Sequence, residues 1–194
     1  MRCKSIQSSH RQEVEGVALF RVREAELGDV SGIADVHIKS WHSTYRGIVA
    51  DDFIDNLTHS RSAERWGKIL SDAESTAFIK VAVGEEGRIV GFAVGGRERD
   101  GDQNYDAELY AIYLLKEYQG KGIGRQLLSD VARGLMEKSF RSMLVWALRD
   151  NHSARKFYRA LGGKEYRQRM CDIGGISYAD VAYGWDSLSA LIRE

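Results

Sequence analysis

Between a strand-like segment and a helix-like segment lies Gln119-Gly-Lys-Gly-Ile-Gly124. Residues 108–115 have the apolar character of a buried strand, and the apolar residues after the glycines recur at helical spacing as far as Lys138. Three glycines allow a ligand to approach the backbone closely, and a helix that begins here directs unpaired N–H groups and the positive end of its dipole at that ligand. The segment is therefore a candidate cradle for a pyrophosphate group. The alternative is a tight strand-to-helix turn that needs flexible residues.

Two other phosphate-binding motifs fit this segment less well. A Walker A loop requires Gly-Lys followed by Ser or Thr, and none of the Gly-Lys pairs at 67–68, 120–121 and 163–164 is followed by either. A dinucleotide fingerprint counted from Gly120 would need glycine where Arg125 stands, and it normally opens the first unit of a parallel sheet. The Walker motif is excluded, and a dinucleotide-binding oxidoreductase remains a weaker alternative.

The rest of the chain predicts an α+β fold built on a central mixed sheet. Residues 84–87 and Gly174-Gly175 have the composition of hairpin connections. We expect residues 1–17 to form a flexible N-terminal extension and residues 18–194 to form a single domain. The other predicted elements are strands over 18–24, 77–83, 88–94, 108–115, 143–147, 165–173 and 177–183, and helices around 30–41, 53–57, 66–70, 123–138 and 154–161.

The composition is that of an ordinary globular protein, with 43% hydrophobic and 29% charged residues. Lys and Arg number 28, as do Asp and Glu, so the chain has no net charge to gather nucleic acid or an anionic membrane, and its apolar runs are too short to span one. Cys3 and Cys171 make no disulfide framework, and the first residues lack the apolar stretch of a signal peptide. We therefore expect a cytoplasmic protein without nucleic-acid or membrane partners.

Three motifs, in the family's order, resemble the GNAT superfamily of N-acetyltransferases. Residues 119–124 are similar to its Q/R-x-x-G-x-G/A signature, and residues 151–163 resemble its N-x-x-A-x-x-F-Y-x-x-L-G-F segment. Residues 41–48 resemble a W-x-x-T-Y-x-G-I region of many bacterial members, and the whole match spans about residues 19–186. The resemblance implies a three-layer α/β/α fold with a twisted, mostly antiparallel sheet. It also implies acetyl transfer from acetyl-CoA to a primary amine by direct attack in a ternary complex. Gly163 replaces the family's usual aromatic residue, which implies looser packing there.

The resemblance implies catalytic roles for two residues. Glu108 lies 11 positions before Gln119, at the spacing of a glutamate that some members use to deprotonate the amine, usually through water. Strand alternation places Glu108 on an apolar face with Tyr110, and the alternative is a solvated strand end. Tyr158 matches a helix tyrosine that lies beside the cofactor sulfur and donates to the departing thiolate. The alternative for Tyr158 is a core position in an apolar helix stripe.

For acetyl-CoA, the resemblance implies a site built largely from main-chain groups. The strand at 112–114 should splay from its neighbour and offer main-chain groups to the pantetheine arm and an N–H to the oxyanion, with its side chains in the core. Lys121 and Arg125 either meet phosphate charge or are exposed cations. Asn151 can cap the next helix, bond the pantetheine amide, or do both. The expected cofactor residues are Ile112, Tyr113, Leu114, Gln119, Gly120, Lys121, Gly122, Ile123, Gly124, Arg125 and Asn151.

The acceptor side is less defined by the sequence. Trp41, His42 and Tyr45 lie in a region that resembles the family's variable substrate region, where they would form a lip over a small-molecule or peptide amine. Alternatively, Trp41 and Tyr45 are a core pair. The histidines and cysteines show no metal-ligand spacing, so we expect no metal, and we expect Cys171 to be a small core residue. The rival function is a non-catalytic CoA-binding sensor or regulatory module, and a homodimer stays open because family members are often dimers.

Overall fold

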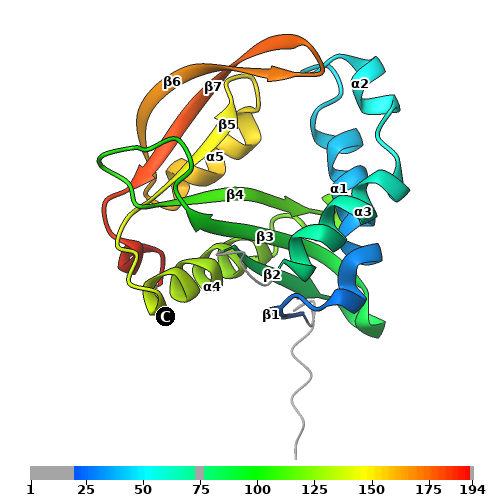
Figure 1. The fold of residues 1–194 in the computed structure, drawn as a ribbon, viewed down its shortest axis with the longest axis horizontal. Helices are drawn as coiled ribbons and strands as arrows, with labels where there is room; N and C mark the ends of the chain where they lie inside the picture. Colours follow the sequence, from blue (N-terminus) through cyan, green and yellow to red (C-terminus); the bar gives the residue numbers. More distant parts are fainter. Residues whose placement is uncertain (1–19, 73–76, 193–194) are drawn as a thin grey trace, which may run out of the picture.

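A computed structural model describes residues 20–72 and 77–192, which form one seven-stranded mixed sheet flanked by helices (Figure 1). The strand order is β1-β2-β3-β4-β5-β7-β6. All neighbouring strands are antiparallel except β4 and β5. The predicted α+β class with a mostly antiparallel sheet is therefore confirmed. The strands are β1 (Arg21–Glu24), β2 (Phe78–Val83), β3 (Ile89–Arg97), β4 (Ala107–Leu114), β5 (Met143–Leu148), β6 (Lys164–Ile173) and β7 (Ile176–Trp185).

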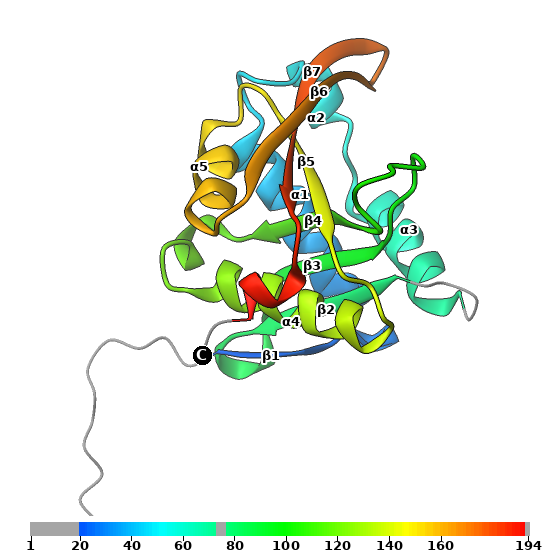
Figure 2. The ribbon, with the colours of Figure 1, turned by 90° about the vertical axis from the view of Figure 1, so that its left-hand side faces the viewer.

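Helices cover both faces of the sheet (Figure 2). The first three predicted helical segments are confirmed, and the Thr58 hydroxyl caps α3 by accepting a hydrogen bond from the Arg61 N–H. α1 packs with α3 against β3 and β4, and α4 lies across β2, β3 and β4. The α-helices are α1 (Val30–Thr44), α2 (Asp51–Asp55), α3 (His59–Ser71), α4 (Ile123–Glu137) and α5 (His152–Ala160). Short 3-10 helices span Leu27–Asp29, Glu85–Gly87, Lys116–Tyr118 and Leu188–Leu191.

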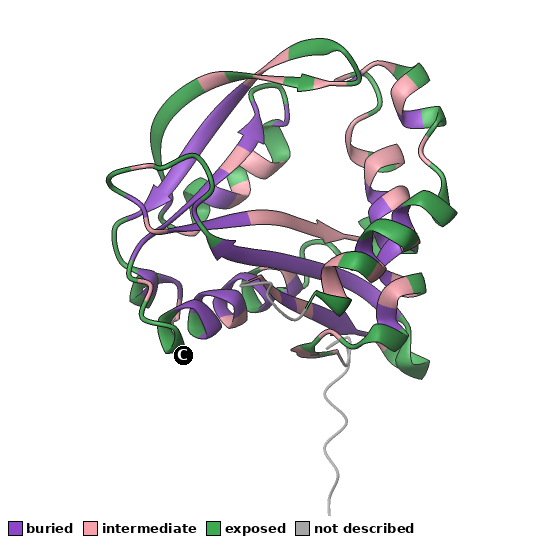
Figure 3. Cartoon of the chain, viewed as in Figure 1, coloured by how far each residue is buried: buried purple, intermediate pink, exposed green. Residues whose placement is uncertain are grey.

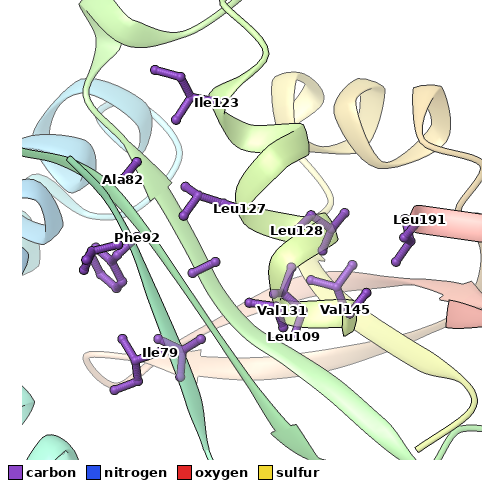
Figure 4. Packing of buried hydrophobic residues seen from close by; sticks show 14 of the residues in the cluster. Ile79, Ala82, Phe92, Leu109, Ile123, Leu127, Leu128, Val131, Val145 and Leu191 are labelled. Carbon is purple, nitrogen blue, oxygen red and sulfur yellow. The ribbon is translucent and has the colours of Figure 1, made fainter. Parts of the chain in front are cut away.

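The close approach of α4 to the sheet depends on a glycine of β3. A Cβ atom on Gly95 would lie 2.6 Å from Cγ1 of Val131. The helix can therefore approach the sheet closely enough to exclude water from its apolar stripe. Figure 4 shows Leu127, Leu128 and Val131 pointing from α4 into this core layer. Because α4 is held here, the glycine-rich loop before it has a fixed place above the sheet.

The looser packing expected at Gly163 is wrong, because β7 supplies the aromatic group. A Cβ atom on Gly163 would lie 2.9 Å from the indole of Trp185. That indole is 2% exposed, and its Nε1 donates a hydrogen bond to the Leu161 carbonyl at 2.9 Å. The end of α5 is thus fastened to the sheet, which also holds Tyr158 of that helix in place.

The hairpin of β6 and β7 runs from the sheet to α2 (Figure 1). Its two-residue turn at Gly174-Gly175 is confirmed, as is the connection at 84–87 between β2 and β3. At the tip, the ring of Phe53 of α2 fills the space beside Gly174, while much of the hairpin is exposed (Figure 3). Cys171 is half-buried in the small apolar cluster beneath the tip, and burial raises the pKa of its thiol to about 11.

Two sequence expectations concern the ends and the surroundings of the chain. The extension predicted over residues 1–17 lies outside the described residues. Within residues 20–72 and 77–192, no helix has the length and apolar character needed to cross a membrane.

Candidate active site

The two parallel strands separate after a short stretch of pairing, and a cleft opens there. β4 and β5 pair at Ala107–Met143, Glu108–Leu144 and Leu109–Val145. Beyond Leu109, β4 stays with β3 while β5 stays with β7, so residues 112–114 lack a strand on one side. The cleft has a volume of about 720 Å³, which suits a small-molecule cofactor. The sequence-predicted residues that line it are Tyr45, Ile112, Tyr113, Leu114, Gln119, Gly120, Gly122, Gly124, Arg125, Asn151 and Tyr158.

Two residues of β4 turn their main-chain groups toward the cleft. The Leu115 N–H donates to the Val90 carbonyl of β3 at 2.9 Å. Because the direction of these groups alternates along a strand, the N–H and C=O groups of Ile112 and Leu114 point away from β3, to the side that β5 has left. The amide of Gln119 donates to the Leu114 carbonyl from that side at 3.2 Å. The splayed strand expected from the sequence is therefore present.

Tyr113 is arranged in the opposite way from its two neighbours. Its main chain faces β3, where its carbonyl oxygen would lie 3.0 Å from a Cβ atom on Gly91. Its side chain, expected to be simple core, instead lines the cleft. Of the three main-chain contributions expected from this strand, the structure offers those of Ile112 and Leu114.

The glycine-rich loop has the geometry of an anion cradle. Gly120 and Gly122 have φ angles of +75° and +82°, in the left-handed region that favours glycine. Gly122 directly precedes α4, whose first N–H groups have no partner within the helix. No described atom lies within 4 Å of where a Cβ atom on either glycine would be, so a ligand can approach the backbone. Arg125, in the first helical turn, lines the cleft and adds positive charge to that of the helix dipole.

Two predicted residues of the same loop do not line the cleft. The Lys121 ammonium group lies 5.4 Å from the ring centroid of Tyr118. Ile123 is fully buried in the core layer beneath α4 (Figure 4), so it can offer a ligand only its main chain.

Three phenols from separate elements converge where β4 and β5 part. Tyr45 follows the last turn of α1, Tyr113 belongs to β4, and Tyr158 belongs to α5. Burial raises the pKa of all three phenols above the usual value. The Tyr113 hydroxyl raises the pKa of Tyr45 and of Tyr158 further. All three are neutral at physiological pH and act as hydrogen-bond donors.

Tyr158 has both features that the sequence analysis gave as alternatives, a ring packed in the core and a hydroxyl at the cleft. Its ring is 5% exposed and packs against Phe157, Tyr183 and Trp185 at centroid distances of 5.4, 5.9 and 6.1 Å. Among the described residues, no partner hydrogen-bonds to its hydroxyl. The ring is therefore fixed by the core, while the O–H at the cleft is available to a ligand.

Asn151 links the start of α5 to the phenols. Its Oδ1 accepts a hydrogen bond from the Ala154 N–H at 3.1 Å, so the expected helix cap is present. This bond leaves the Nδ2 end of the amide for other partners, and hydrogen bonding from Asn151 partly offsets the rise in the pKa of Tyr45. Asn151 is 5% exposed and lines the cleft.

Glu108 lies outside the lining of the cleft, in a setting that differs from both sequence interpretations. It is 2% exposed, so it is not a solvated strand end. Its carboxylate accepts hydrogen bonds from Nε of Arg99, at 2.9 Å, and from Nη2 of the same guanidinium, so its surroundings are not apolar either. Arg99 also stacks on the ring of Tyr110, 4.1 Å from the centroid, and it comes from the loop before β4 that showed no motif in the sequence.

The expected acceptor residues are divided by the structure. Tyr45 lines the cleft, whereas Trp41 lies behind it and donates a hydrogen bond from Nε1 to the Tyr113 hydroxyl at 3.1 Å. Trp41 and Tyr45 also stack at 4.5 Å, so the core-pair interpretation holds for that contact. His42 does not line the cleft, and its Nδ1 lies 3.3 Å from a guanidinium nitrogen of Arg46.

Two aromatic residues of the cleft, Trp146 and Phe157, were not among the predicted site residues. Trp146 lies on β5 just after its pairing with β4 ends, and it lines the cleft. The guanidinium of Arg169 stacks on it at 3.9 Å, and its buried indole Nε1 has no partner among the described residues. Strand alternation could have placed Trp146 on one face, but nothing local showed which face borders the cleft.

No cluster of His, Cys, Asp or Glu among residues 20–72 and 77–192 has the arrangement of a metal site. Cys171 does not line the cleft.

Comparison with known proteins gives one consistent result. The sequence model of the Acetyltransferase (GNAT) family matches residues 38–162. An uncharacterized N-acetyltransferase of Bacillus subtilis, YuaI, is 39% identical over 173 residues, which cover 89% of this chain and 96% of that protein. Among solved structures, the PaiA N-acetyltransferase of Thermoplasma acidophilum in complex with coenzyme A superposes with a TM-score of 0.68 at 22% identity, over 84% of this chain and 98% of that one. The YncA acetyltransferase of Salmonella typhimurium with acetyl-CoA gives 0.66 at 19% identity, over 88% and 95%.

Proposed function

Because the chain belongs to the GNAT family of acetyltransferases and is an acyltransferase, we propose that it transfers an acetyl group from acetyl-CoA to a primary amine by direct attack in a ternary complex. The observation that carries the proposal is the course of the cleft. It extends from the glycine-rich loop, along the free side of β4, to the Tyr158 hydroxyl. Acetyl-CoA needs these features in this order, namely an anion cradle, a main-chain track for pantetheine and a donor for sulfur. The related folds solved with coenzyme A or acetyl-CoA support this choice of cosubstrate.

The proposed cofactor contacts divide by chemistry. The N–H groups at the start of α4 and the Arg125 guanidinium bind the pyrophosphate, with Gly120 and Gly122 providing the open backbone. Main-chain groups of Ile112 and Leu114 pair with the pantetheine amides as a neighbouring strand would. The Asn151 Nδ2 group has two N–H bonds, so it can donate to pantetheine as well as to Tyr45. Lys121 contributes only long-range charge, since its side chain does not line the cleft.

In the proposed chemistry, the amine nitrogen attacks the thioester carbonyl carbon and the C=O electron pair moves to oxygen. An N–H of β4 on the free side of the strand stabilises this oxyanion. The intermediate collapses with cleavage of the C–S bond, whose electron pair goes to sulfur. Tyr158 then acts as the catalytic donor, because its hydroxyl faces the cleft without a protein partner and its ring cannot move. The amine releases one proton through water and the Tyr158 phenolate takes one up, so the products are an acetamide, the CoA thiol and a neutral Tyr158.

Glu108 remains our proposed base for the amine proton. Since it does not line the cleft and its side chain is 2% exposed, the proton must reach it through water. Arg99 holds the carboxylate in one orientation, and this guanidinium is 56% exposed, so it can shift when an acceptor ammonium group enters.

For the acceptor, we propose a small-molecule or peptide amine that enters past Tyr45 on the α1 side of the cleft. Trp41 supports that lip from behind and does not touch the acceptor directly. His42 is not part of the lip, because it faces Arg46 and lies outside the cleft lining.

A thermal melt with acetyl-CoA, NADH and ATP tests the cofactor assignment. A ligand at about 100 times its Kd adds roughly 2.7 kcal/mol of stability, which for a chain of this length is a rise of roughly 5–10 °C in Tm. We expect this rise with acetyl-CoA alone. An equal rise with NADH would favour the dinucleotide interpretation. Turnover with an amine separates the enzyme from the non-catalytic sensor.

A further inference from the structure

The cleft opens where β4 and β5 part, so it borders both faces of the sheet. Val145 of β5 pairs with Tyr183 of β7, whose ring lies 5.9 Å from that of Tyr158 in α5. α5 therefore covers the face of β5 that Val145 takes. Trp146 is the next residue along the strand, so its side chain points to the opposite face.

α4 lies on the same face as α5, and α1 lies on the other. Leu109 pairs with Val145 across the parallel strands and with Gly95 of β3, so these three positions share a face. Gly95 is the glycine that admits α4 to the sheet. α1 packs against β3 and β4 from the opposite face (Figure 2). The Tyr113 ring points to that face, where it lies 5.4 Å from the ring of His37 in α1.

The acceptor side of the cleft is the face of α1. Every group that we assign to the cofactor belongs to α4, α5 or the free side of β4, so an attacking amine must come from the face that the cofactor leaves open. Glu108 pairs with Leu144, two positions before Trp146, which places the proposed base on the same face. The side chains that border the cleft here are those of Tyr45, Ile48, Tyr113 and Trp146.

The acceptor side presents aromatic rings that are fixed in place. Trp41 stacks on Tyr45 at 4.5 Å and donates to the Tyr113 hydroxyl at 3.1 Å, so one indole holds both of these rings. Trp146 borders the cleft from β5, with the guanidinium of Arg169 stacked on it at 3.9 Å. The Trp146 Nε1 is buried, so the part of that ring at the cleft is carbon. Fixed rings lose little conformational freedom when another ring packs against them.

Among the described residues, no charged side chain lines the acceptor side. The ionisable lining residues other than tyrosines flank the glycine-rich loop or stand at the start of α5, and they are Lys116, Arg125, Asp150 and His152. Beyond the lining, Arg169 donates to Asp100 and its Nε lies 3.7 Å from Asp180. Arg99 is bound to Glu108. A second ionic group on the acceptor would have to break one of these pairs or lose its hydration without a partner.

The remaining polar groups near this side are neutral. α1 contributes Ser40, Ser43 and Thr44 to the lining. Ser40 donates to the Leu114 carbonyl at 3.4 Å, and Ser43 donates to the Ser40 carbonyl at 3.3 Å. These two hydroxyls are therefore engaged along the cofactor track and do not supply charge to an acceptor.

We infer that the acceptor is a primary amine joined by a short alkyl chain to an aromatic ring, without a second charged group, and that its ring packs against Tyr45 and Trp146. This inference rests on the proposed acetyl transfer and names the acceptor class for it. The chemistry is unchanged, because the amine still loses its proton through water to Glu108 and attacks the thioester. Polyamines, aminoglycosides and free amino acids each bring a further charge that this side does not match.

Four amines that differ in one feature each test the acceptor class on the wild-type protein. Phenethylamine is compared with hexylamine, which lacks the ring, and with phenylalanine, which adds a carboxylate. Hexylamine is compared with hexamethylenediamine, which adds a second ammonium group. The measured quantity is kcat/KM for release of thiol from acetyl-CoA. We expect phenethylamine to exceed hexylamine by about fivefold or more, and each added charge to lower kcat/KM by at least about 30-fold.

Trp146→Leu keeps an apolar side chain and removes the ring. We expect the preference for phenethylamine over hexylamine to fall to about twofold or less, through KM, while the Kd for acetyl-CoA stays within about twofold. Tyr166→Leu is the matched control. Arg167 stacks on both Trp146 and Tyr166, at 5.4 and 5.6 Å, but Tyr166 lies outside the cleft lining, so its loss should leave the preference unchanged.

The outcomes separate this inference from the proposed function. A higher kcat/KM for phenylalanine or for hexamethylenediamine than for its uncharged partner would refute the acceptor class and leave acetyl transfer standing. An aromatic preference that survives in a folded Trp146→Leu would refute the role of that ring, and turnover confined to amines outside this set would refute the class. No release of thiol with any amine would overturn both the inference and the proposed function.

Discussion

Trp41 and Tyr113, 72 positions apart in the chain, are joined by an indole-to-phenol hydrogen bond of 3.1 Å. It connects α1, on one face of the sheet, to the strand along which we place the cofactor. Trp41 was expected to form part of the lip over the acceptor amine, but this bond places it behind the wall of the cleft. The bond also brings a polar group into a strand position that the sequence presents as core.

The hydroxyl of Tyr158 is the group that our account depends on for departure of the thiolate. We expect Tyr158→Phe to lower kcat at least about tenfold while the Kd for acetyl-CoA stays within about twofold, because the ring still packs against Trp185. Steady-state kinetics and calorimetric titration measure the two quantities. Tyr166→Phe, at a 36% exposed position outside the cleft, serves as the control. Equal activity of the two variants would remove Tyr158 from the mechanism.

Glu108→Gln keeps the shape of the side chain and removes its basicity. If Glu108 receives the amine proton, kcat should fall at least about tenfold near neutral pH and recover in part as the pH rises and more of the amine is already deprotonated. The buried Glu98, which accepts hydrogen bonds from the N–H groups of Asp100 and Asp102, is the control carboxylate. A pH–rate profile of Glu108→Gln that follows the wild-type profile would show that the base lies elsewhere.

Gly122 and Gly101 separate the effect of backbone strain from that of a lost phosphate site. Both have a positive φ, +82° and +73°, and neither has an atom within 4 Å of a Cβ position. Alanine at either position should cost about 1 kcal/mol of stability. Only Gly122→Ala should also weaken acetyl-CoA binding, by at least about tenfold, because its methyl group occupies the cradle. Equal binding by both variants in a titration would argue against the cradle.

Two other glycines test the packing of the fold in opposite directions. A methyl group on Gly95 would collide with Val131 of α4, so Gly95→Ala should lower the free energy of unfolding by about 1–3 kcal/mol. Gly67 lies inside α3, and its nearest side-chain atom, on Val30, would be 4.0 Å from the new methyl group. Gly67→Ala should therefore stabilise the protein by about 0.4–1 kcal/mol. Urea unfolding measures both, and the reverse order would contradict the described packing.

The buried His37 should make the free energy of unfolding depend on pH. Burial lowers its pKa from 6.5 to about 4, and its Nδ1 lies 3.0 Å from the Ser62 hydroxyl. Above about pH 6.5 the imidazole is neutral in both the folded and unfolded chains, and His37 then imposes no penalty. As the pH falls from about 6.5 to about 4, the unfolded chain takes up the proton first, so the His37 contribution removes up to about 3 kcal/mol of stability. Urea unfolding between these pH values measures it.

The control for that prediction is His37→Leu, which should flatten this part of the pH profile even if it is less stable throughout. His42→Gln, in contact with Arg46 outside the cleft lining, should leave the slope unchanged. A slope that survives in His37→Leu would assign it to other groups.

The sheet and its helices could be predicted because their signals are local. The nearly continuous apolar run of 108–115 arises from a strand inside the sheet, and the helical spacing from Ile123 arises from burial on one side of a helix. The glycines at 120 and 122 were identified because a ligand can approach their backbone before a helix, and the structure adds that both have a positive φ. The helix cap formed by Asn151 could also be predicted from the sequence, because it depends on a hydrogen bond from Ala154, three positions away.

The remaining features of the site depend on contacts between residues far apart in sequence. Arg99 reaches Glu108 only because the loop before β4 folds back along that strand, so the surroundings of the carboxylate could not be predicted from alternation. Trp185 fills the space beside Gly163 from the last strand. The hydrogen bond that the Tyr113 hydroxyl accepts depends in the same way on Trp41, because strand periodicity says which face a side chain takes but not what it meets there.

The most direct test of acetyl transfer is the release of free CoA thiol from acetyl-CoA, followed in time with and without a panel of primary amines. The panel covers arylalkylamines, polyamines, aminoglycosides, amino acids and peptides with a free N-terminus, and Tyr158→Phe is measured in parallel. We expect at least one amine to raise the rate well above the amine-free rate, its acetamide to appear by mass spectrometry, and Tyr158→Phe to lose most of the increase. Saturable binding of acetyl-CoA with no amine raising the release of thiol would contradict the account and favour a CoA-binding sensor.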